Sequence, residues 1–269
     1  MTDQAPLLTR VHAVEGGNIF QITMNRPDVH NCVNGEMAAL FLDAWRRFRD
    51  DPDLVVCVLH GAGSKSFCSG ADLTALNELA ELYDDPERIR DRVKNGTGPL
   101  GGSRIVQTKP IITVSQGYTY AGGLELFCHG HLRIAEKQAL FSVACRRWGV
   151  PLVDGGTVYL PRMLGFASAL PLIITGQRIR ARRAYEIGLA WELTPRGQGL
   201  DRAMKLAREI CGQPRDALMA DMRSALGGYH LNLKDALELE AENLDPLTRS
   251  ESMREGVARF NEGARFWVR

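Results

Sequence analysis

The chain has 269 residues, which is compatible with one large α/β domain or two small ones and is enough to bury a substantial core. Its 33 lysines and arginines nearly balance its 32 aspartates and glutamates, and the net charge of +1 gives no long-range attraction to nucleic acid or to an anionic membrane. Because the six cysteines are scattered, no apolar run reaches the roughly 18 residues of a membrane span and the first residues do not resemble a signal peptide, we expect a soluble, cytoplasmic protein.

The first part of the chain predicts a hairpin, a helix and a buried strand. Leu8–Val14 and Ile19–Met24 are β-rich runs on either side of a glycine-containing turn, which is typical of a hairpin. Asn34 can cap a helix whose apolar residues follow the 3.6-residue period. Leu54–Leu59 is then a continuous apolar run of strand length, as expected in a sheet that is covered on both faces.

A loop, a second buried strand and a series of helices follow. The loop Gly61–Asp72 is rich in glycine and serine, and a short helix is predicted to begin near Asp72. Residues 84–104 are charged and then glycine-rich, which predicts a mobile segment. Ile111–Val114 leads through a second glycine-containing loop into another helix, so two strand–loop–helix units predict a βαβ core with parallel strands. Beyond residue 160 the pattern is helical, at roughly 166–175, 180–188, 200–212, 215–228 and 233–262.

The first loop lacks both common phosphate-binding patterns. Ser66 occupies the last glycine position of G-x-G-x-x-G, and the Gly-Lys-Ser/Thr of a P-loop is absent. What remains is Ser69-Gly70-Ala71, which turns into a helix at Asp72. Backbone amides at a helix start are unsatisfied donors that attract developing negative charge. An anion-facing turn and a plain turn capped by Asp72 are both compatible with this segment alone.

The second loop places an amide donor and a carboxylate on one side of a helix. Gly122 and Gly123 open the helix and remove side chains where a ligand would approach the backbone. Glu125 lies three residues after Gly122, on the same helical face. Ser115 is not a nucleophile elbow, because Thr113 stands where that motif requires a glycine.

Both loops resemble motifs of the crotonase (enoyl-CoA hydratase/isomerase) superfamily. The family pattern Phe-x-x-Gly-Ala-Asp-(Leu/Ile) is matched by Phe67-Cys68-Ser69-Gly70-Ala71-Asp72-Leu73. The second family motif is matched by Pro110, Gly117 and Ala121-Gly122-Gly123-Leu124-Glu125-Leu126. Further matches, such as Gly155-Gly156-Thr157 and Leu160-Pro161-Arg162, follow in the family order, and the resemblance spans roughly residues 10–262.

The resemblance implies an α/β fold with a crotonase-like ββα spiral core over residues 1–199. It also implies a C-terminal helical trimerisation region over residues 200–269, and hence a homotrimer or a dimer of trimers. By position, the amides of Ala71 and Gly122 would form an oxyanion hole for a thioester. Coenzyme A would be the substrate carrier, with no other cofactor and no metal. The residues expected to contact coenzyme A are Ser69, Gly70, Asp72 and Leu73.

The sequence departs from the family at one catalytic position. Glu125 matches the first catalytic glutamate of the hydratases, but Cys145 stands where the second would fall, and an unperturbed thiol is mostly neutral at pH 7. Asp154 falls where dienoyl-CoA isomerases, naphthoate synthases and a dehalogenase of the superfamily carry a catalytic aspartate, if one extra residue is allowed after Gly149. Asp154 is therefore either a second catalytic acid or the cap of the helix that runs toward Arg162.

The resemblance predicts an acyl-CoA lyase that adds water to a 2-enoyl-CoA, or removes it, through a stabilised thioester enolate. Glu125 and Asp154 would transfer the protons. An enoyl- or dienoyl-CoA double-bond isomerase is the alternative, because one carboxylate that removes and returns a proton would suffice. A catalytically weak acyl-CoA-binding subunit is the alternative from another class. Cys128-His129-Gly130-His131 has no further ligand at metal spacing, so a metal site is not predicted.

Overall fold

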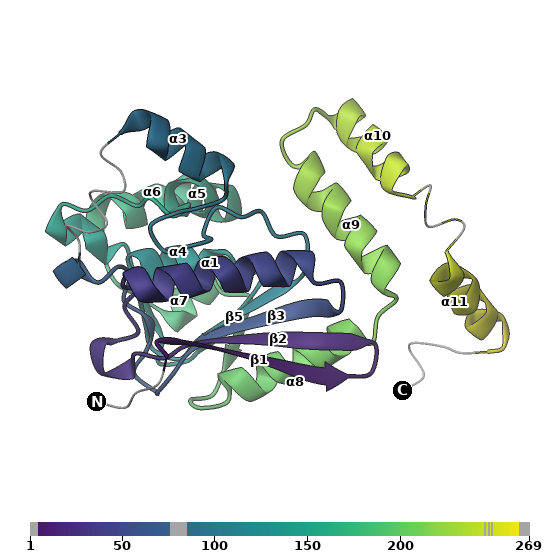
Figure 1. Cartoon of the computed structure of the whole chain (residues 1–269), viewed down its shortest axis with the longest axis horizontal. Coiled ribbons are helices and arrows are strands. Elements are labelled where there is room, and N and C mark those ends of the chain that lie inside the picture. Colours follow the sequence, from purple (N-terminus) through teal and green to yellow (C-terminus); the bar gives the residue numbers. More distant parts are fainter. Residues whose placement is uncertain (1–4, 76–84, 245, 247, 249, 264–269) are drawn as a thin grey trace.

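The computed structural model describes residues 5–75, 85–244, 246, 248 and 250–263, and this part of the chain contains a large and a small β-sheet (Figure 1). The large sheet has the order β1-β2-β3-β5-β7-β10, and its neighbours run parallel except for the β1–β2 hairpin. Its strands are β1 (Leu7–Val14), β2 (Gly17–Met24), β3 (Leu54–Gly61), β5 (Ile111–Ser115), β7 (Leu132–Glu136) and β10 (Glu192–Thr194).

The small sheet is built from short strands that follow the strands of the large sheet along the chain. Its order is β4-β6-β8-β9, with β9 antiparallel to β8 and the other pairs parallel. Its strands are β4 (Ser66–Cys68), β6 (Tyr118–Tyr120), β8 (Leu140–Ser142) and β9 (Ile179–Arg180). Each of β3, β5 and β7 is therefore followed by a small-sheet strand, which is the repeat of the predicted ββα core. The predicted α/β class with a ββα core is confirmed, whereas a trimerisation role of the C-terminal helices stays a prediction.

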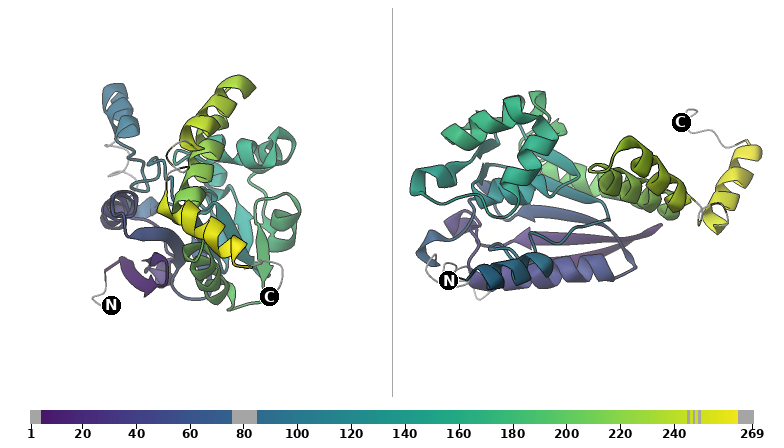
Figure 2. Two further views of the ribbon diagram at one scale, coloured as in Figure 1. Left: turned by 90° about the vertical axis from the view of Figure 1, so that its right-hand side faces the viewer. Right: turned by 90° about the horizontal axis from the view of Figure 1, so that it is seen from above.

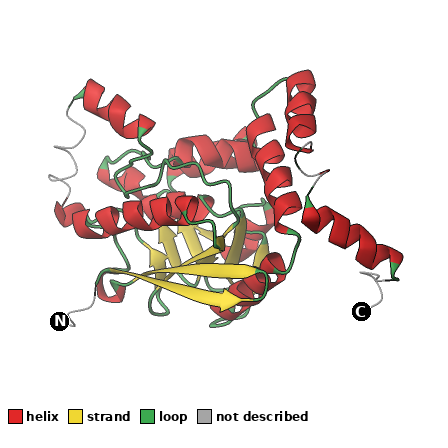
Figure 3. Cartoon of the chain, turned by 45° about the vertical axis from the view of Figure 1, so that its right-hand side comes forward, coloured by secondary structure: helices red, strands yellow, loops and turns green. Residues whose placement is uncertain are grey.

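Helices cover both faces of the large sheet (Figures 1 and 3). Helix α1 packs its aromatic residues Phe41, Trp45 and Phe48 into the core on one face, and α8 packs Ala203 and Leu206 on the other. The helices are α1 (Gly35–Asp50), α3 (Pro86–Lys94), α4 (Gly122–Cys128), α5 (Gly156–Leu164), α6 (Phe166–Thr175), α7 (Ala181–Glu186), α8 (Gly199–Cys211), α9 (Arg215–Gly228), α10 (Leu233–Leu244) and α11 (Glu251–Asn261). Short 3₁₀ segments are η1 (Pro27–Val29), η2 (Leu73–Ala75) and η3 (Ala144–Trp148).

Several predicted elements are confirmed. The hairpin forms with Val14 opposite Gly17, and α1 begins where predicted because the Asn34 side chain accepts a hydrogen bond of 3.0 Å from the Met37 amide. The two continuous apolar runs are strands β3 and β5, which lie side by side and parallel at the centre of the large sheet.

Other predictions were incomplete or wrong. Residues 84–104 contain helix α3, whose first turn is capped by the Asp85 side chain. The single helix predicted over 233–262 is two helices, because Pro246 has no amide hydrogen to continue α10. The helix predicted near Asp72 is the single 3₁₀ turn η2 within the described residues.

The last helices extend away from the sheets. Helix α8 still packs against β3, β5 and β7, whereas α9 and α10 pack mainly on each other and α11 lies farther out (Figures 1 and 2). The predicted boundary between residues 199 and 200 stays a prediction. Within the described part of the chain, no helix combines the length and the apolar character needed to cross a bilayer.

Candidate active site

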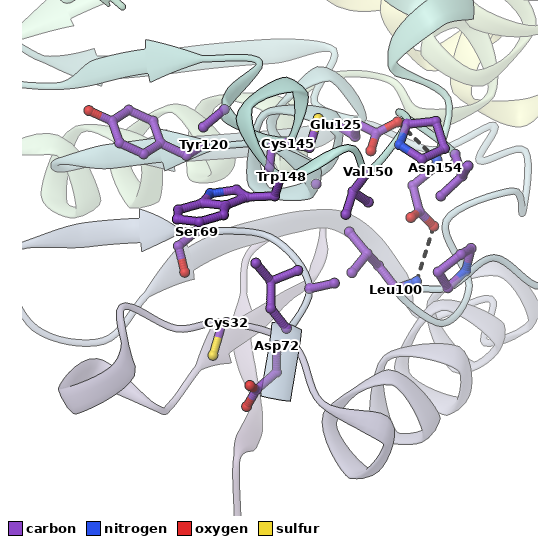
Figure 4. Close-up of a pocket in the computed structure, with 18 of the residues that line it drawn as sticks. Cys32, Ser69, Asp72, Leu100, Tyr120, Glu125, Cys145, Trp148, Val150 and Asp154 are labelled. Carbon is purple, nitrogen blue, oxygen red and sulfur yellow. Dashed lines mark hydrogen bonds between the residues drawn. The ribbon is translucent and has the colours of Figure 1, made fainter. Parts of the chain in front are cut away.

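A cavity of about 640 Å³ opens between the two turns singled out in the sequence (Figure 4). One wall is the turn after β4, which includes Ser69 and Ala71, and the adjoining wall is the turn between β6 and α4. The loop 99–104, the 3₁₀ segment η3 and the loop 150–154 complete the lining. Most of the lining is apolar, and the exceptions include the carboxylates of Glu125 and Asp154.

The first turn leaves one amide without a partner. The Val33 amide donates to the Gly70 carbonyl at 2.8 Å, and the Asp72 amide donates to the Val33 carbonyl at 2.8 Å. Ala71 lies between these two bonds, and its own amide donates no hydrogen bond to any described residue. Because Ala71 lines the cavity, this free N–H is available to a bound ligand.

The second turn provides another free amide. Ala121 has φ 52° and ψ −125°, a conformation that alanine rarely adopts, and its amide is bonded to the Ser142 carbonyl. Gly122 is the first residue of α4, so its amide has no partner within the helix and, among the described residues, none outside it.

The two turns come close only because position 70 has no side chain. Gly70 has φ 99°, and a Cβ atom there would lie 2.8 Å from the Gly122 nitrogen and 3.0 Å from the Ala121 Cβ. A larger residue would force the turns apart. Two free donors therefore lie on adjoining walls of one cavity, an arrangement that stabilises negative charge on a ligand oxygen.

Glu125 is held at the cavity by the backbone of a distant loop. Its side chain is 2% exposed, and Oε1 accepts hydrogen bonds from the amides of Asp154, at 2.9 Å, and Gly156, at 2.8 Å. Burial and, second, the charge of Asp154 raise the pKa of Glu125 to about 8, against the opposing effect of the two amides. This carboxyl group can gain and lose a proton near neutral pH.

Asp154 is the second buried carboxylate of the cavity. Its Oδ1 accepts hydrogen bonds from the Leu100 amide, at 3.1 Å, and from the Ser103 hydroxyl. Burial raises the pKa of Asp154 above its usual range, and these two donors act in the opposite direction. The interpretation as a helix cap was wrong, because the N-cap of α5 is Gly155 and no side chain caps that helix.

Cys145 lies in the same cavity, on η3, and is 6% exposed. Burial raises the pKa of its thiol, so the group is neutral at physiological pH. Figure 4 shows that Glu125, Asp154 and Cys145 lie around the same cavity. Of the three groups, only the two carboxyl groups can ionise near neutral pH.

The residues expected to contact coenzyme A lie at or beside the cavity. Ser69, Asp72 and Leu73 line it, and Gly70 is the residue of the first turn that contacts the second turn. Asp72 is also paired with Arg26 at 2.9 Å, and hydrogen bonds from Thr74 and then Arg26 lower the pKa of this carboxyl group.

The loop 96–105 was missed by the sequence interpretation, although it supplies Leu100 and Ser103. Its only local signal is the cluster of glycines at positions 96, 98, 101 and 102. In the Cys128–His131 segment, the His129 ring forms a hydrogen bond with the Asp154 carbonyl, and the His131 ring accepts one from the Ile111 amide. Both rings are therefore engaged in hydrogen bonds with backbone groups. No group of three or more candidate metal ligands occurs in the described residues.

Comparison with known proteins agrees with this geometry. The family model for enoyl-CoA hydratase/isomerase matches residues 15–267. Enoyl-CoA hydratase EchA19 of Mycobacterium tuberculosis is 32% identical over 252 residues, which are 91% of each chain. The 1,2-epoxyphenylacetyl-CoA isomerase of Escherichia coli is 31% identical, and the match covers 92% of this chain and 93% of the isomerase. The (E)-benzylidenesuccinyl-CoA hydratase of Thauera aromatica is 29% identical, over 91% of this chain and 93% of its own.

Solved structures give the same result. The crystal structure of enoyl-CoA hydratase EchA1 from Mycobacterium marinum superposes with a TM-score of 0.84, at 30% identity and 96% coverage of both chains. An enoyl-CoA hydratase from Bacillus anthracis superposes with a TM-score of 0.82 at 25% identity, over 94% of this chain and 96% of that one. The protein is an enzyme of the enoyl-CoA hydratase/isomerase family, the crotonase superfamily.

Proposed function

We propose that the chain is an acyl-CoA lyase of the enoyl-CoA hydratase type, which adds water to a 2-enoyl-CoA or removes it. The observation that supports this most is the pair of unpartnered amides, at Ala71 and Gly122, beside a buried glutamate. The thioester oxygen would accept hydrogen bonds from both amides, so that the charge of the enolate develops against two fixed donors. Loss of one such donor typically costs about 3–4 kcal/mol of transition-state stabilisation.

The two carboxylates would divide the proton transfers. The raised pKa of Glu125, about 8, keeps a proton on this acid near neutral pH. Asp154 would be the charged member of the pair, because its Oδ1 accepts hydrogen bonds from the Leu100 amide and the Ser103 hydroxyl and because two charges in one buried pair are costly. When water bonds to the β-carbon, Asp154 would accept the proton of the water. Glu125 would deliver its proton to the α-carbon, and transfer of one proton between the acids would restore the starting state.

Isomerisation of a double bond is the second candidate, and Cys145 is the observation that favours it. Its neutral thiol leaves the family's second glutamate position without a carboxylate. Glu125 alone could remove a proton from one carbon and return it to another. Relatives named as hydratases and one named as an isomerase occur at about 30% identity, so the name of a relative does not choose between the two reactions.

Coenzyme A would be the substrate carrier, with no resident cofactor or metal. Its adenine would lie against residues 69–73, and the acyl group would occupy the mostly apolar remainder of the cavity. A catalytically weak binding subunit is disfavoured by the two carboxylates, since binding alone does not need buried acids. The cytoplasmic location stays a prediction, supported by six cysteines that are all free and buried.

The carboxylate assignment predicts unequal effects of three substitutions. Glu125→Gln and Asp154→Asn should each lower turnover by about 10²-fold or more, and Cys145→Ala by less than about tenfold, because the neutral thiol does not release its proton near neutral pH. Turnover of a series of 2-enoyl-CoA thioesters is followed by mass spectrometry in deuterated water. Hydration adds the mass of water and one deuterium at the α-carbon, whereas isomerisation adds no water.

Two outcomes would change the interpretation. Full activity of Asp154→Asn would leave Glu125 as the sole acid and favour the isomerase, and full activity of Glu125→Gln would overturn both mechanisms. Circular dichroism of each variant checks that it is folded.

The oxyanion assignment predicts that proline at position 122 abolishes turnover, because proline has no amide hydrogen. A Cβ atom at Gly122 would lie 2.6 Å from Leu100 Cδ1, so the substitution is made in a Leu100→Ala background and compared with Leu100→Ala alone. We expect a loss of about 10²–10³-fold in turnover with a similar melting temperature. Retention of more than a tenth of the activity of Leu100→Ala would show that the Gly122 amide is not an oxyanion donor.

Because the pKa of Glu125 is raised, we expect the Glu125→Gln variant to become more stable relative to wild type as the pH rises. Between the ordinary value of 4.5 and about 8, the folded protein holds a proton that the unfolded chain releases, so wild-type stability falls as the pH rises. The glutamine variant lacks this loss and keeps an oxygen for the two amides. Its melting temperature relative to wild type should therefore increase steadily from pH 5 to pH 8.

Asp72→Asn is a control, because the pKa of Asp72 is shifted in the opposite direction from that of Glu125. Because the pKa of Asp72 is lowered in the folded state, its stabilising effect is present at neutral pH and is lost as the pH falls. This variant should be less stable than wild type at pH 7 and should approach it in acid. A difference between Glu125→Gln and wild type that does not change with pH contradicts the proton assignment.

The exposed apolar residues of the last helices support assembly into a homotrimer or a dimer of trimers. Leu233, Leu237 and Val257 are 77%, 55% and 51% exposed in the single chain, more apolar surface than an isolated helical layer normally carries. Light scattering at micromolar concentration should give three or six times the mass of one chain. Leu237→Glu should shift the distribution toward the monomer, and a stable wild-type monomer would refute the proposal.

A further inference from the structure

The loop 96–105 contacts both parts of the candidate site. Gly98 and Gly101 pair through two backbone hydrogen bonds of 2.6 and 2.9 Å, so the loop turns sharply at Pro99 and Leu100. The Leu100 side chain packs against Gly122, where an added Cβ would lie 2.6 Å from Leu100 Cδ1. The same residue donates its amide to Asp154 Oδ1.

The shape of the loop is adapted to this contact. A Cβ atom at Gly98 would meet both the Ser103 hydroxyl and Asp154 Oδ1, so the absence of a side chain there admits the carboxylate. On the other side, a Cβ at Gly101 would meet the Ala38 carbonyl, so the loop lies directly on α1. The loop is thus fixed between a core helix and the acid.

Ser103 has its hydroxyl directed to the same carboxylate oxygen. The residue is 1% exposed, and its hydroxyl donates to Asp154 Oδ1 beside the Leu100 amide. Both donors are on one oxygen, and Oδ2 accepts no hydrogen bond from any described residue. Because Asp154 lines the cavity, this arrangement leaves Oδ2 as the oxygen that can meet water or substrate.

We propose that Ser103 is a positioning residue for the proposed reaction: with the Leu100 amide, it binds one oxygen of Asp154 and so orients the other toward the cavity. This inference rests on the proposed function, in which ionised Asp154 accepts a proton. Burial raises the pKa of Asp154, whereas the Ser103 hydroxyl, like the Leu100 amide and the charge of Arg104, lowers it, because hydrogen bonds to the ionised form favour that form. Glu125 is the neighbouring acid, and its own pKa is raised by burial and then by the charge of Asp154. A serine that served only the fold would have no effect on proton transfer.

The test compares Ser103→Ala with a matched loss of a buried hydroxyl elsewhere. Ser115 is also fully buried, and its hydroxyl bonds the Gly117 carbonyl and the Thr119 hydroxyl away from the cavity lining. We expect Ser103→Ala to lower kcat about tenfold with little change in KM and to move the acidic limb of the kcat/KM profile to higher pH. Ser115→Ala should lose comparable stability and leave the pH profile unchanged.

A double variant and a milder variant complete the experiment. In an Asp154→Asn background, Ser103→Ala should cause no further loss of kcat, because it acts through Asp154. Ser103→Cys keeps the size of the side chain and a weak donor, so its acidic limb should lie between wild type and Ser103→Ala. An unshifted limb in either folded variant, or additive losses in the double variant, overturns the proposal.

Failure of the proposed function gives a different result. If wild type converts no thioester, that function is wrong, and the contact is then tested by infrared titration of the carboxyl band that disappears in Asp154→Asn. Ser103→Ala should raise the pH at which this band titrates in the protein alone. An equal titration in wild type and Ser103→Ala would overturn the positioning role.

Discussion

The close approach of two turns at Gly70 is the constraint on which the rest of the site depends. The turns follow β4 and β6, and pairing of these strands in the small sheet brings them together. Any side chain at position 70 would meet the Gly122 nitrogen, so the distance between the two free amides is set by the smallest residue available. The ββα repeat therefore does more than build a core: it places the ends of successive repeats against each other at the cavity.

The two acids are connected by the backbone as well as by charge. One of the two amides that bind Glu125 belongs to Asp154, so Asp154 supports Glu125 through its main chain and contributes a carboxylate through its side chain. Both groups are buried, and burial and the charge of Asp154 together raise the pKa of Glu125, so two negative charges in this cavity would be costly. Amide and hydroxyl donors from two loops compensate for burial of the single charge, which explains how the site tolerates a pair of carboxylates in an apolar cavity.

Local patterns in the sequence were sufficient for the parts of the site that depend on turns and helical spacing. Gly122 and Glu125 are three residues apart on one helix, so their shared face could be predicted without tertiary information. The three-residue strands β4, β6 and β8 are too short to show a period, and only their pairing makes them strands. The contacts of Asp154 with Leu100 and Ser103 join segments more than fifty residues apart, and no local pattern encodes them.

At Ala121, the stability of the fold and the fixed direction of a catalytic amide place opposite requirements on the backbone. A non-glycine residue at φ 52° stores strain on the order of 1–3 kcal/mol, which the surrounding bonds must hold. Glycine at this position would relax that strain, but it would also let the peptide plane that carries the Gly122 N–H swing away from its direction into the cavity. A search for stabilising substitutions would therefore select Ala121 for replacement by glycine, and the substitution would loosen one of the two amide dipoles whose fixed direction the chemistry requires.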